Sequence, residues 1–426
     1  MFGSDSAPVR MTKWRTLALA TLGFNFSFLI WFSFAPFSGV VAEEFGLSSF
    51  EVGVLASSAI WLIPVGRVVV GWLSDRFGAT AVFSILLATV GLFSILSAFS
   101  TSYLTFFLTR LVVASAGVSF VIGIQHVSEW FPDEQLGTAE GIYAGIGNAG
   151  AGVGALVLPR AFGADWRTAF LLTGIVSVVF AVVYFVFGVD ARTEAQRQAT
   201  RSRATLREWL WVATRYGVVV LTLGYMISFG LEIAMNGWLP TYAETVFGAE
   251  QVAAATIAAA FSLTAGLTRP FGGYISDRLV RNRRDILPGF GGRYREQWTI
   301  VSMGLIVVGL VGLGIAGAFG SLAVVAVAVV FVGFACAMAE AAIFAQVPET
   351  FPNRTGMAAG VIGGVSTVGG AIYPLVFGYT TELGVSSLGY LAVAGSMVPV
   401  VLLAAWAFRP ARVESVNREG LVNLGD

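Results

Sequence analysis

Two segments of the chain are the most informative about its architecture: IWLIPVGRVVVGWLSDRFG, residues 60–78, and LTAGLTRPFGGYISDRL, residues 263–279. Each places one arginine, Arg67 or Arg269, inside an apolar stretch, four residues before a glycine and eight before an Asp-Arg pair. In a helix that rises about 1.5 Å per residue, each guanidinium would lie roughly 12 Å from the polar end of its helix, close to the middle of a bilayer. A charge at that depth costs at least about 2.5–3.5 kcal/mol. Because this costly feature occurs twice, the sequence predicts one central site for a small anion.

The composition is that of a membrane protein with many spans. The 426 residues are 56% hydrophobic and 12% charged, whereas soluble chains carry about 25% charged residues. Long apolar runs such as AVFSILLATVGLFSILSAF, residues 81–99, predict spanning helices rather than the short alternating strands of a barrel. The formal net charge of zero gives no reason to expect a nucleic-acid partner. The single cysteine, Cys336, excludes an intramolecular disulfide.

The apolar runs predict twelve transmembrane helices. They cover residues 14–40, 50–73, 80–99, 103–128, 136–160, 167–189, 213–240, 252–275, 297–318, 320–345, 355–378 and 386–408. Loops rich in arginine alternate with short acidic loops. The positive-inside rule therefore predicts a multi-pass protein of the cytoplasmic membrane with both termini in the cytoplasm.

The chain repeats itself. The two arginine segments align with a constant offset of 202 residues, and WFPDEQLGTAEGIYAGIGNAGAG (130–152) aligns with TFPNRTGMAAGVIGGVSTVGG (350–370). We therefore expect an all-α membrane protein made of two six-helix halves, residues 1–190 and 213–426. A cytoplasmic linker, 191–212, joins them, and a short cytoplasmic tail ends the chain. Duplicated halves of this kind place a transporter's binding site near the midplane.

Two motifs resemble those of a known family. The loop pattern G-x-x-x-D-R-x-G from Gly71, repeated in part from Gly273, resembles the signature of the major facilitator superfamily. The stretches GIYAGIGNAGAGVGALVLP (141–159) and GVIGGVSTVGGAIYPLVFG (360–378) resemble the paired signatures of the nitrate/nitrite porter family. The resemblance covers essentially the whole chain, and it implies an alternating-access carrier without cofactor or metal.

The resemblance also implies a set of site residues, because that family holds its anion between two arginines, aromatic rings and polar groups of the signature helices. The implied ligands are Arg67, Arg269, Phe120, Tyr225, Phe229, Asn148 and Ser366. The implied signature glycines are Gly145, Gly147, Gly150, Gly363, Gly364 and Gly369.

Guanidinium chemistry suits a planar monovalent anion such as nitrate, because the group is planar, always charged and able to donate two parallel hydrogen bonds. The alternative is that each arginine pairs with a buried glutamate. Glu340 aligns with Phe120 in the repeat and could partner either arginine, while Glu232 is the better candidate for carrying a proton.

The Asp-Arg pairs at the ends of the two arginine helices have two interpretations. They could form a charge latch that holds one conformation, or they could be charges that only fix the topology. The residues concerned are Asp75, Arg76, Asp277 and Arg278.

These observations predict a monomeric secondary carrier of nitrate and/or nitrite, driven either by proton symport or by nitrate/nitrite exchange. The chain has no G-x-x-x-x-G-K-[ST] loop for ATP. With His126 as the only histidine, it also shows no nucleophile–His–acid arrangement, so an enzyme is not expected. The alternatives are a carrier of formate, cyanate or a monocarboxylate, and a membrane anion sensor that does not transport.

Overall fold

The computed structural model describes residues 7–131, 133–191, 206–351 and 355–409. In those ranges the regular structure is helical, and twelve segments are long and apolar enough to cross a membrane. These spans are Met11–Phe45, Ser49–Phe77, Ala79–Ala98, Tyr103–Ser128, Ala139–Phe162, Trp166–Phe187, Tyr216–Phe247, Gln251–Asn282, Tyr294–Ala318, Leu322–Val347, Met357–Glu382 and Ser386–Ala407. The predicted fold class and number of spans are confirmed.

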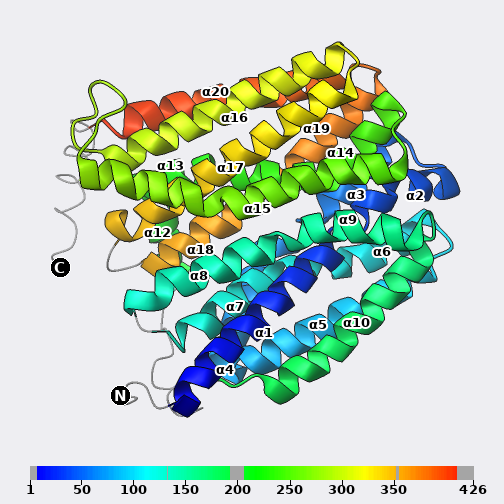
Figure 1. The fold of residues 1–426 in the computed structure, drawn as a ribbon, viewed down its shortest axis with the longest axis horizontal. Coiled ribbons are helices and arrows are strands. Elements are labelled where there is room, and N and C mark those ends of the chain that lie inside the picture. The colour runs from blue at the N-terminus through cyan, green and yellow to red at the C-terminus, as the bar shows by residue number, and fades with distance from the viewer. Residues whose placement is uncertain (1–6, 132, 192–205, 352–354, 410–426) are drawn as a thin grey trace. The chain divides into compact units, whose positions relative to one another are not determined.

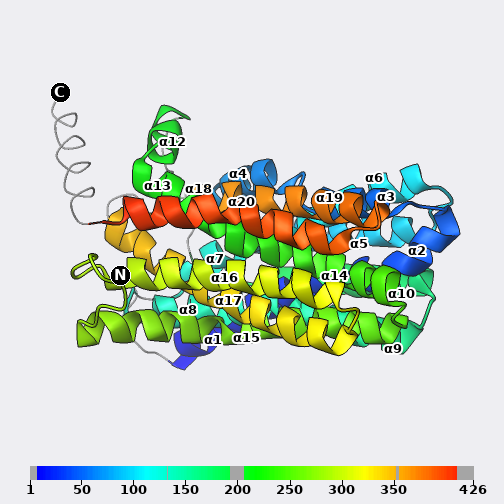
Figure 2. The same cartoon turned by 90° about the horizontal axis from the view of Figure 1, so that it is seen from above.

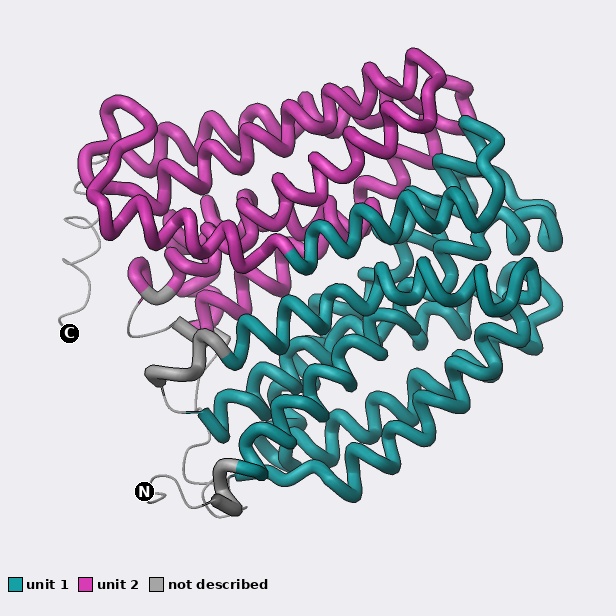
Figure 3. The backbone as a smooth tube through the Cα atoms, viewed as in Figure 1, with its two compact units in different colours: residues 1–203, 236–267 teal, residues 204–235, 268–426 magenta. Residues whose placement is uncertain are grey.

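The chain forms two compact units (Figure 3). The first contains residues 1–203 and 236–267, and the second contains residues 204–235 and 268–426. The predicted halves and linker, 1–190, 191–212 and 213–426, follow one another along the chain. In the structure, however, residues 236–267 of the predicted second half belong to the first compact unit. The division into two sequential six-helix halves stays a prediction.

Residues 236–267 join the first unit through polar contacts with its other helices. The Thr241 hydroxyl donates to the Ser38 hydroxyl at 2.8 Å, and the Gln251 amide donates to the Pro36 carbonyl at 2.9 Å. These contacts fix the later part of α14 (Leu231–Phe247) and the start of α15 (Gln251–Asn282) against the end of the first span.

Close helix packing in the first unit depends on small residues. Helices α5 (Ala79–Ala98) and α10 (Trp166–Phe187) lie side by side (Figure 1). A Cβ added at Gly91 would come within 2.7 Å of the Gly174 carbonyl oxygen, and one added at Gly174 within 2.6 Å of the Gly91 oxygen. Two facing glycines let the backbones approach, which increases the packing that holds helices together in lipid.

In the second unit, the long helices α16 (Tyr294–Ala318), α17 (Leu322–Thr350) and α20 (Ser386–Ala407) pack together (Figure 1). A short helix, α12 (Leu206–Ala213), lies beside α13 (Tyr216–Tyr225), as Figure 2 shows. Helix α12 falls within the predicted linker, of which residues 192–205 lie outside the described residues.

The first span is broken, and a buried arginine stabilises the break. Helix α1 (Ala7–Trp31) ends before a short 3-10 turn, and α2 (Ser38–Phe45) continues the span. Arg110 donates to the Trp31 carbonyl at 2.8 Å and to the Ser33 hydroxyl at 3.2 Å. Carbonyls at a helix end lack partners within the helix, so this third intramembrane arginine, which the sequence analysis did not single out, has a structural role.

One glycine explains why the two Asp-Arg helices end differently. Helix α4 (Ile63–Phe77) ends at Gly78, whose φ of 91° is readily available only to glycine. The residue at the matching place in the second copy is Val280, and α15 continues past it to Asn282. The expected end of this helix, near residue 275, was therefore too early.

Candidate functional site

Arg67 points into the interior of the first unit. On α4 the buried side chains are Ile63, Arg67 and Ser74, which are spaced by four and seven residues and so lie along one face. Val65 and Val68, on other faces, are 70% and 63% exposed, whereas Arg67 is only 8% exposed. The helix therefore turns its arginine toward protein and its valines away from it.

A cluster of aromatic rings lies on one side of Arg67. Its guanidinium carbon lies 5.7 Å from the centre of the Phe120 ring, a cation–π contact. Phe120 in turn packs against Phe24 and Tyr143 at centroid distances of 5.6 and 6.2 Å. The structure thus brings together two predicted residues, Arg67 and Phe120, and adds two rings that the sequence analysis did not select.

The fifth span breaks at its signature asparagine. Helix α8 (Asp133–Asn148) ends at Asn148, which is 2% exposed, and α9 (Gly150–Phe162) begins two residues later. A Cβ at Gly150 would overlap the backbone oxygen of Asn25, and the Asn25 amide donates to the Ile146 carbonyl at 2.7 Å. Glycine is needed at position 150 because the backbone of α1 passes directly against it.

Arg269 has two partners in the second unit, and its side chain is 15% exposed. Its Nη1 lies 2.9 Å from Oε2 of Glu340, and its Nη2 donates to the Tyr225 hydroxyl at 2.7 Å. Tyr225 stacks on Phe229 with ring centres 5.1 Å apart and meets the edge of Phe344 at 4.8 Å. The predicted residues Arg269, Tyr225, Phe229 and Glu340 therefore form one cluster, with Phe344 as an addition.

The two arginines differ in what faces them at matching repeat positions. Phe120 faces Arg67, and its repeat counterpart Glu340 faces Arg269. Arg67 thus meets the negative face of a ring, while Arg269 meets a full negative charge. The Arg269 cluster is consequently less positive than a bare guanidinium.

Glu232 lies beside Glu340. Both side chains are buried, at 1% and 0% exposure, and their carboxyl groups are within hydrogen-bonding reach of each other. A hydrogen bond between two carboxyl groups requires a proton, since two carboxylates offer only acceptors. These two predicted residues therefore make a pair that can hold a proton next to Arg269.

The seventh span contains an irregular turn at the Arg269 cluster. A π-helical segment, η3 (Met226–Gly230), separates α13 from α14 and carries Phe229. A Cβ at Gly230 would come within 2.9 Å of the Ser366 carbonyl oxygen, and one at Gly369 within 2.7 Å of the Met226 oxygen. Insertions of this type are frequent at functional sites, but they depend on close backbone contact that no local sequence pattern reveals.

The eleventh span breaks where the fifth does in the repeat. Helix α18 (Thr355–Val365) ends before Ser366, and α19 (Val368–Glu382) starts two residues after it. The Ser366 hydroxyl is buried and has no hydrogen-bond partner among the described residues. It therefore lies at a backbone break, with an unused polar group.

The signature glycines do not all serve one purpose. A Cβ at Gly147 would overlap the Phe24 ring, and a Cβ at Gly145 would lie 3.6 Å from the Gly266 oxygen. Gly363 is buried, while a Cβ at Gly364 would meet no described atom within 4 Å. Tight packing accounts for Gly147, Gly150 and Gly369, and it does not account for Gly364.

In the Asp-Arg pairs, neither aspartate bonds to the arginine beside it. Asp75 accepts a hydrogen bond from the Gln125 amide at 2.9 Å. Arg76 lies over the rings of Trp72 and Phe77, at 5.5 and 5.4 Å. The two members of the pair therefore point to different partners, and a latch at this position stays a prediction.

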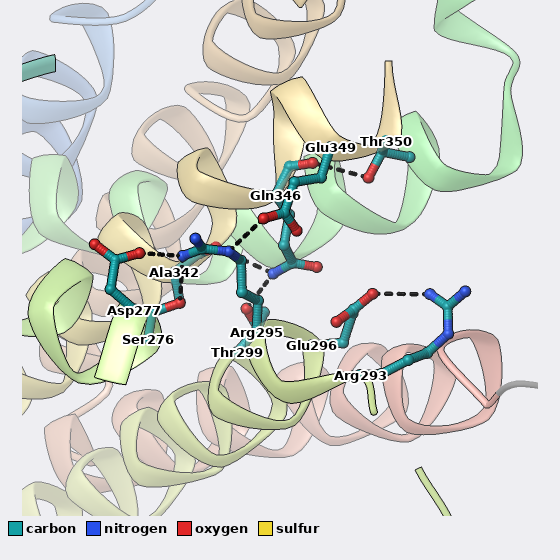
Figure 4. A network of polar contacts seen from close by, with 10 residues as sticks. All are labelled: Ser276, Asp277, Arg293, Arg295, Glu296, Thr299, Ala342, Gln346, Glu349 and Thr350. Carbon is teal, nitrogen blue, oxygen red and sulfur yellow. Dashed lines mark hydrogen bonds and ion pairs between the residues drawn. The ribbon is translucent and has the colours of Figure 1, made fainter. Parts of the chain in front are cut away.

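Asp277 belongs to a network around Arg295 (Figure 4). Arg295 Nη1 donates to Asp277 at 2.6 Å and its Nε donates to Glu349 at 2.6 Å. Arg278 reaches the Tyr274 hydroxyl at 3.4 Å. Arg295 and Glu349 were not predicted from the sequence, because pairing between three helices is not visible in a local motif.

His126 is held by two hydrogen bonds in the first unit. Its Nδ1 lies 2.8 Å from the Tyr184 hydroxyl and its Nε2 lies 3.0 Å from the Val189 carbonyl oxygen. It joins the end of the fourth span to the end of the sixth. Within the described residues, no group of three or more His, Cys, Asp and Glu side chains could hold a metal ion.

Comparison with known proteins agrees with this architecture. A bacterial homologue of the human lysosomal transporter Spinster, in an inward-facing and unoccupied conformation, superposes with a TM-score of 0.72. The two chains share 15% identity, and the match covers 97% of this chain and 99% of the other. At that identity the likeness shows the fold alone.

Sequence relatives cover most of the chain. The probable nitrate/nitrite antiporter NarK1 of Thermus thermophilus is 28% identical over 87% of this chain and 86% of its own length. The nitrate/nitrite transporter NrtP of Picosynechococcus is 26% identical over 88% and 87%, and the high affinity nitrate transporter 2.7 of Arabidopsis thaliana is 28% identical over 84% and 76%. The family profile described as Major Facilitator Superfamily matches residues 20–292. The chain is therefore a multi-pass membrane transporter, not an enzyme, and it belongs to the Major Facilitator Superfamily.

Proposed function

We propose that the protein is a secondary active carrier of nitrate and/or nitrite in the cytoplasmic membrane, with both termini in the cytoplasm. It works as a monomer by alternating access, and Arg67 and Arg269 bind the anion. Coupling is either to protons or to exchange of nitrate against nitrite. The names of the sequence relatives support the substrate class.

The observation that carries the proposal is the pair of oriented guanidiniums, one buried and one partly exposed, at matching positions of the repeat. Arg67 rests on an aromatic ring, and Arg269 is held by Tyr225 and Glu340. Arg67 and Arg269 lie within membrane-spanning helices, where an arginine is costly, and their matching places in the repeat favour a shared ligand.

Asn148 and Ser366 are the proposed polar contacts, because each lies buried at a break in a signature span. Phe120, Tyr225 and Phe229 are the proposed aromatic walls. A flat ring packs well against a planar anion such as nitrate, whereas a larger carboxylate carries a bulky substituent. This argument favours nitrate and nitrite over a monocarboxylate.

The test is uptake of labelled nitrate into proteoliposomes that contain the purified protein, with competition by nitrite, formate, cyanate and lactate. We expect nitrite and unlabelled nitrate to compete and lactate not to compete. Equal or stronger competition by formate or cyanate would favour the other small-anion carrier. Nitrate binding without any flux would favour the sensor.

A further inference from the structure

The pairing of Arg269 with Glu340 raises a question that the proposed function leaves open. A guanidinium that holds an internal carboxylate at 2.9 Å already has its counterion. A substrate anion that approaches the same guanidinium would be repelled by that carboxylate, strongly so where water is scarce. Arg269 can bind the anion well only if the charge on Glu340 is removed.

The residues around Glu340 allow its negative charge to be removed by protonation. Apart from Arg269, no N–H or hydroxyl group of the described residues donates to either oxygen of Glu340 or to Oε2 of Glu232. The carboxyl groups of Glu340 and Glu232 adjoin each other and are buried, at 0% and 1% exposure. Two adjacent buried carboxylates cannot both stay ionised beside one arginine, so the pair shares a proton when the cluster is empty.

The other titratable groups near the two glutamates do not exchange protons at neutral pH. They are Arg269 on α15, Tyr225 at the end of α13, Cys336 on α17 and, beside Cys336, Tyr373 on α19. The arginine keeps its proton at all physiological pH values, and burial opposes ionisation of a phenol or a thiol. Proton exchange at neutral pH is left to the two glutamates.

We infer that Glu340 is a tethered counterion of Arg269 which the substrate anion replaces, and that Glu340 and Glu232 together take up one proton per anion bound. The inference rests on the proposed function and chooses proton symport from its two coupling modes. In the empty state, Arg269 balances one carboxylate, and the second carboxyl group is protonated. In the loaded state, Arg269 balances the anion, and both carboxyl groups are protonated. The cluster keeps the same net charge in both states, and one anion and one proton cross together without net charge movement.

The first test uses the wild-type protein alone. Nitrate binding in detergent is measured by calorimetry in buffers of different ionisation enthalpy, between pH 5.5 and 8. We expect about one proton to be taken up per nitrate bound, and the dissociation constant to rise about tenfold per pH unit above the titration of the pair. Nitrate binding without proton uptake at every pH would overturn the inference while leaving the proposed function intact.

The second test measures transport in proteoliposomes. An inward proton gradient should drive nitrate accumulation, an internal pH dye should report about one proton per nitrate, and a potassium–valinomycin potential should have no effect. Glu340→Gln and Glu232→Gln should lower the proton to nitrate ratio at least fivefold, with nitrate/nitrite exchange continuing at a reduced rate. Glu250→Gln, at an exposed position outside this cluster, is the matched control.

The outcomes separate the two proposals. A wild type that exchanges nitrate for nitrite but ignores the proton gradient would refute the proton pair alone. Unchanged proton coupling in both glutamine variants would do the same. A wild type that neither binds nor moves nitrate would refute the proposed function itself. Should Glu340→Gln fail to fold, Glu340→Asp and the wild-type calorimetry still decide the question.

Discussion

Replacement of Arg269 by lysine is the sharpest test of the proposed binding site. The guanidinium uses Nη1 for Glu340, at 2.9 Å, and Nη2 for Tyr225, at 2.7 Å. These two bonds orient the planar group and leave its other N–H groups for a ligand. A lysine ammonium keeps the charge, but its single nitrogen cannot reproduce this planar geometry.

The expected loss follows from one charge-assisted hydrogen bond. Removing such a bond from a water-poor site costs about 1.5–3 kcal/mol, which weakens nitrate binding roughly 10- to 100-fold. Because the charge is kept, binding should weaken rather than disappear. Calorimetry on the purified protein gives the dissociation constant, and uptake into proteoliposomes gives the matching rise in KM.

The control for Arg269→Lys is Arg281→Lys, an exposed position on the same helix. It should bind nitrate as the wild type does. If Arg269→Lys folds, melts at the wild-type temperature and binds nitrate within twofold of the wild type, Arg269 is not an anion ligand. The two-arginine site would then have to be abandoned.

Three further predictions concern the scaffold. Gly150→Val should lower the melting temperature by several degrees, since overpacking typically costs about 1–3 kcal/mol. Gly141→Val is the control, because a Cβ at Gly141 meets no described atom within 4 Å, and it should lower the melting temperature far less. Arg110→Lys should destabilise the protein by roughly 1–3 kcal/mol through poorly satisfied buried carbonyls, yet leave the nitrate dissociation constant of the folded fraction unchanged, which calorimetry can check. Arg295→Gln should slow transport more than Arg293→Gln. Arg295 pairs with carboxylates of two other helices, whereas Arg293 pairs with Glu296, three residues further along the chain. Equal transport rates in the two variants would argue against a conformational role for the Arg295 network.

Most of the membrane-spanning architecture could be predicted from the apolar runs in the sequence. Every expected span has a structural counterpart, because apolar runs long enough to cross a bilayer have few alternatives to a helix. The boundaries were less predictable. The eighth span continues to Asn282 because its loop lacks the glycine that ends the second span at Gly78. The first, fifth, seventh and eleventh spans are interrupted by turns that depend on contacts with other helices.

Most residues of the candidate site could be predicted, but the contacts between them could not. The repeat singled out Arg67, Arg269 and Glu340, since a charge in an apolar run stands out in any sequence, and the family resemblance implied Phe120. The partners of those charges could not be assigned in advance. The sequence analysis allowed Glu340 to pair with either arginine, and it did not select Phe24, Tyr143 or Phe344.

Twelve membrane-spanning helices, arginines at repeated positions within apolar stretches, and the glycine-rich segments that accompany them could all be inferred from the order of residues. These properties depend on hydropathy and spacing along one chain, which the order of residues states directly. The folded chain was needed to see that Arg269 faces a carboxylate, Arg67 faces a ring and Arg110 caps a helix end. Those outcomes depend on contacts between residues far apart in the chain, such as Arg269 with Tyr225 and Glu340. The energy of a buried charge is set by these partners, and hence its role could be judged only after they were seen.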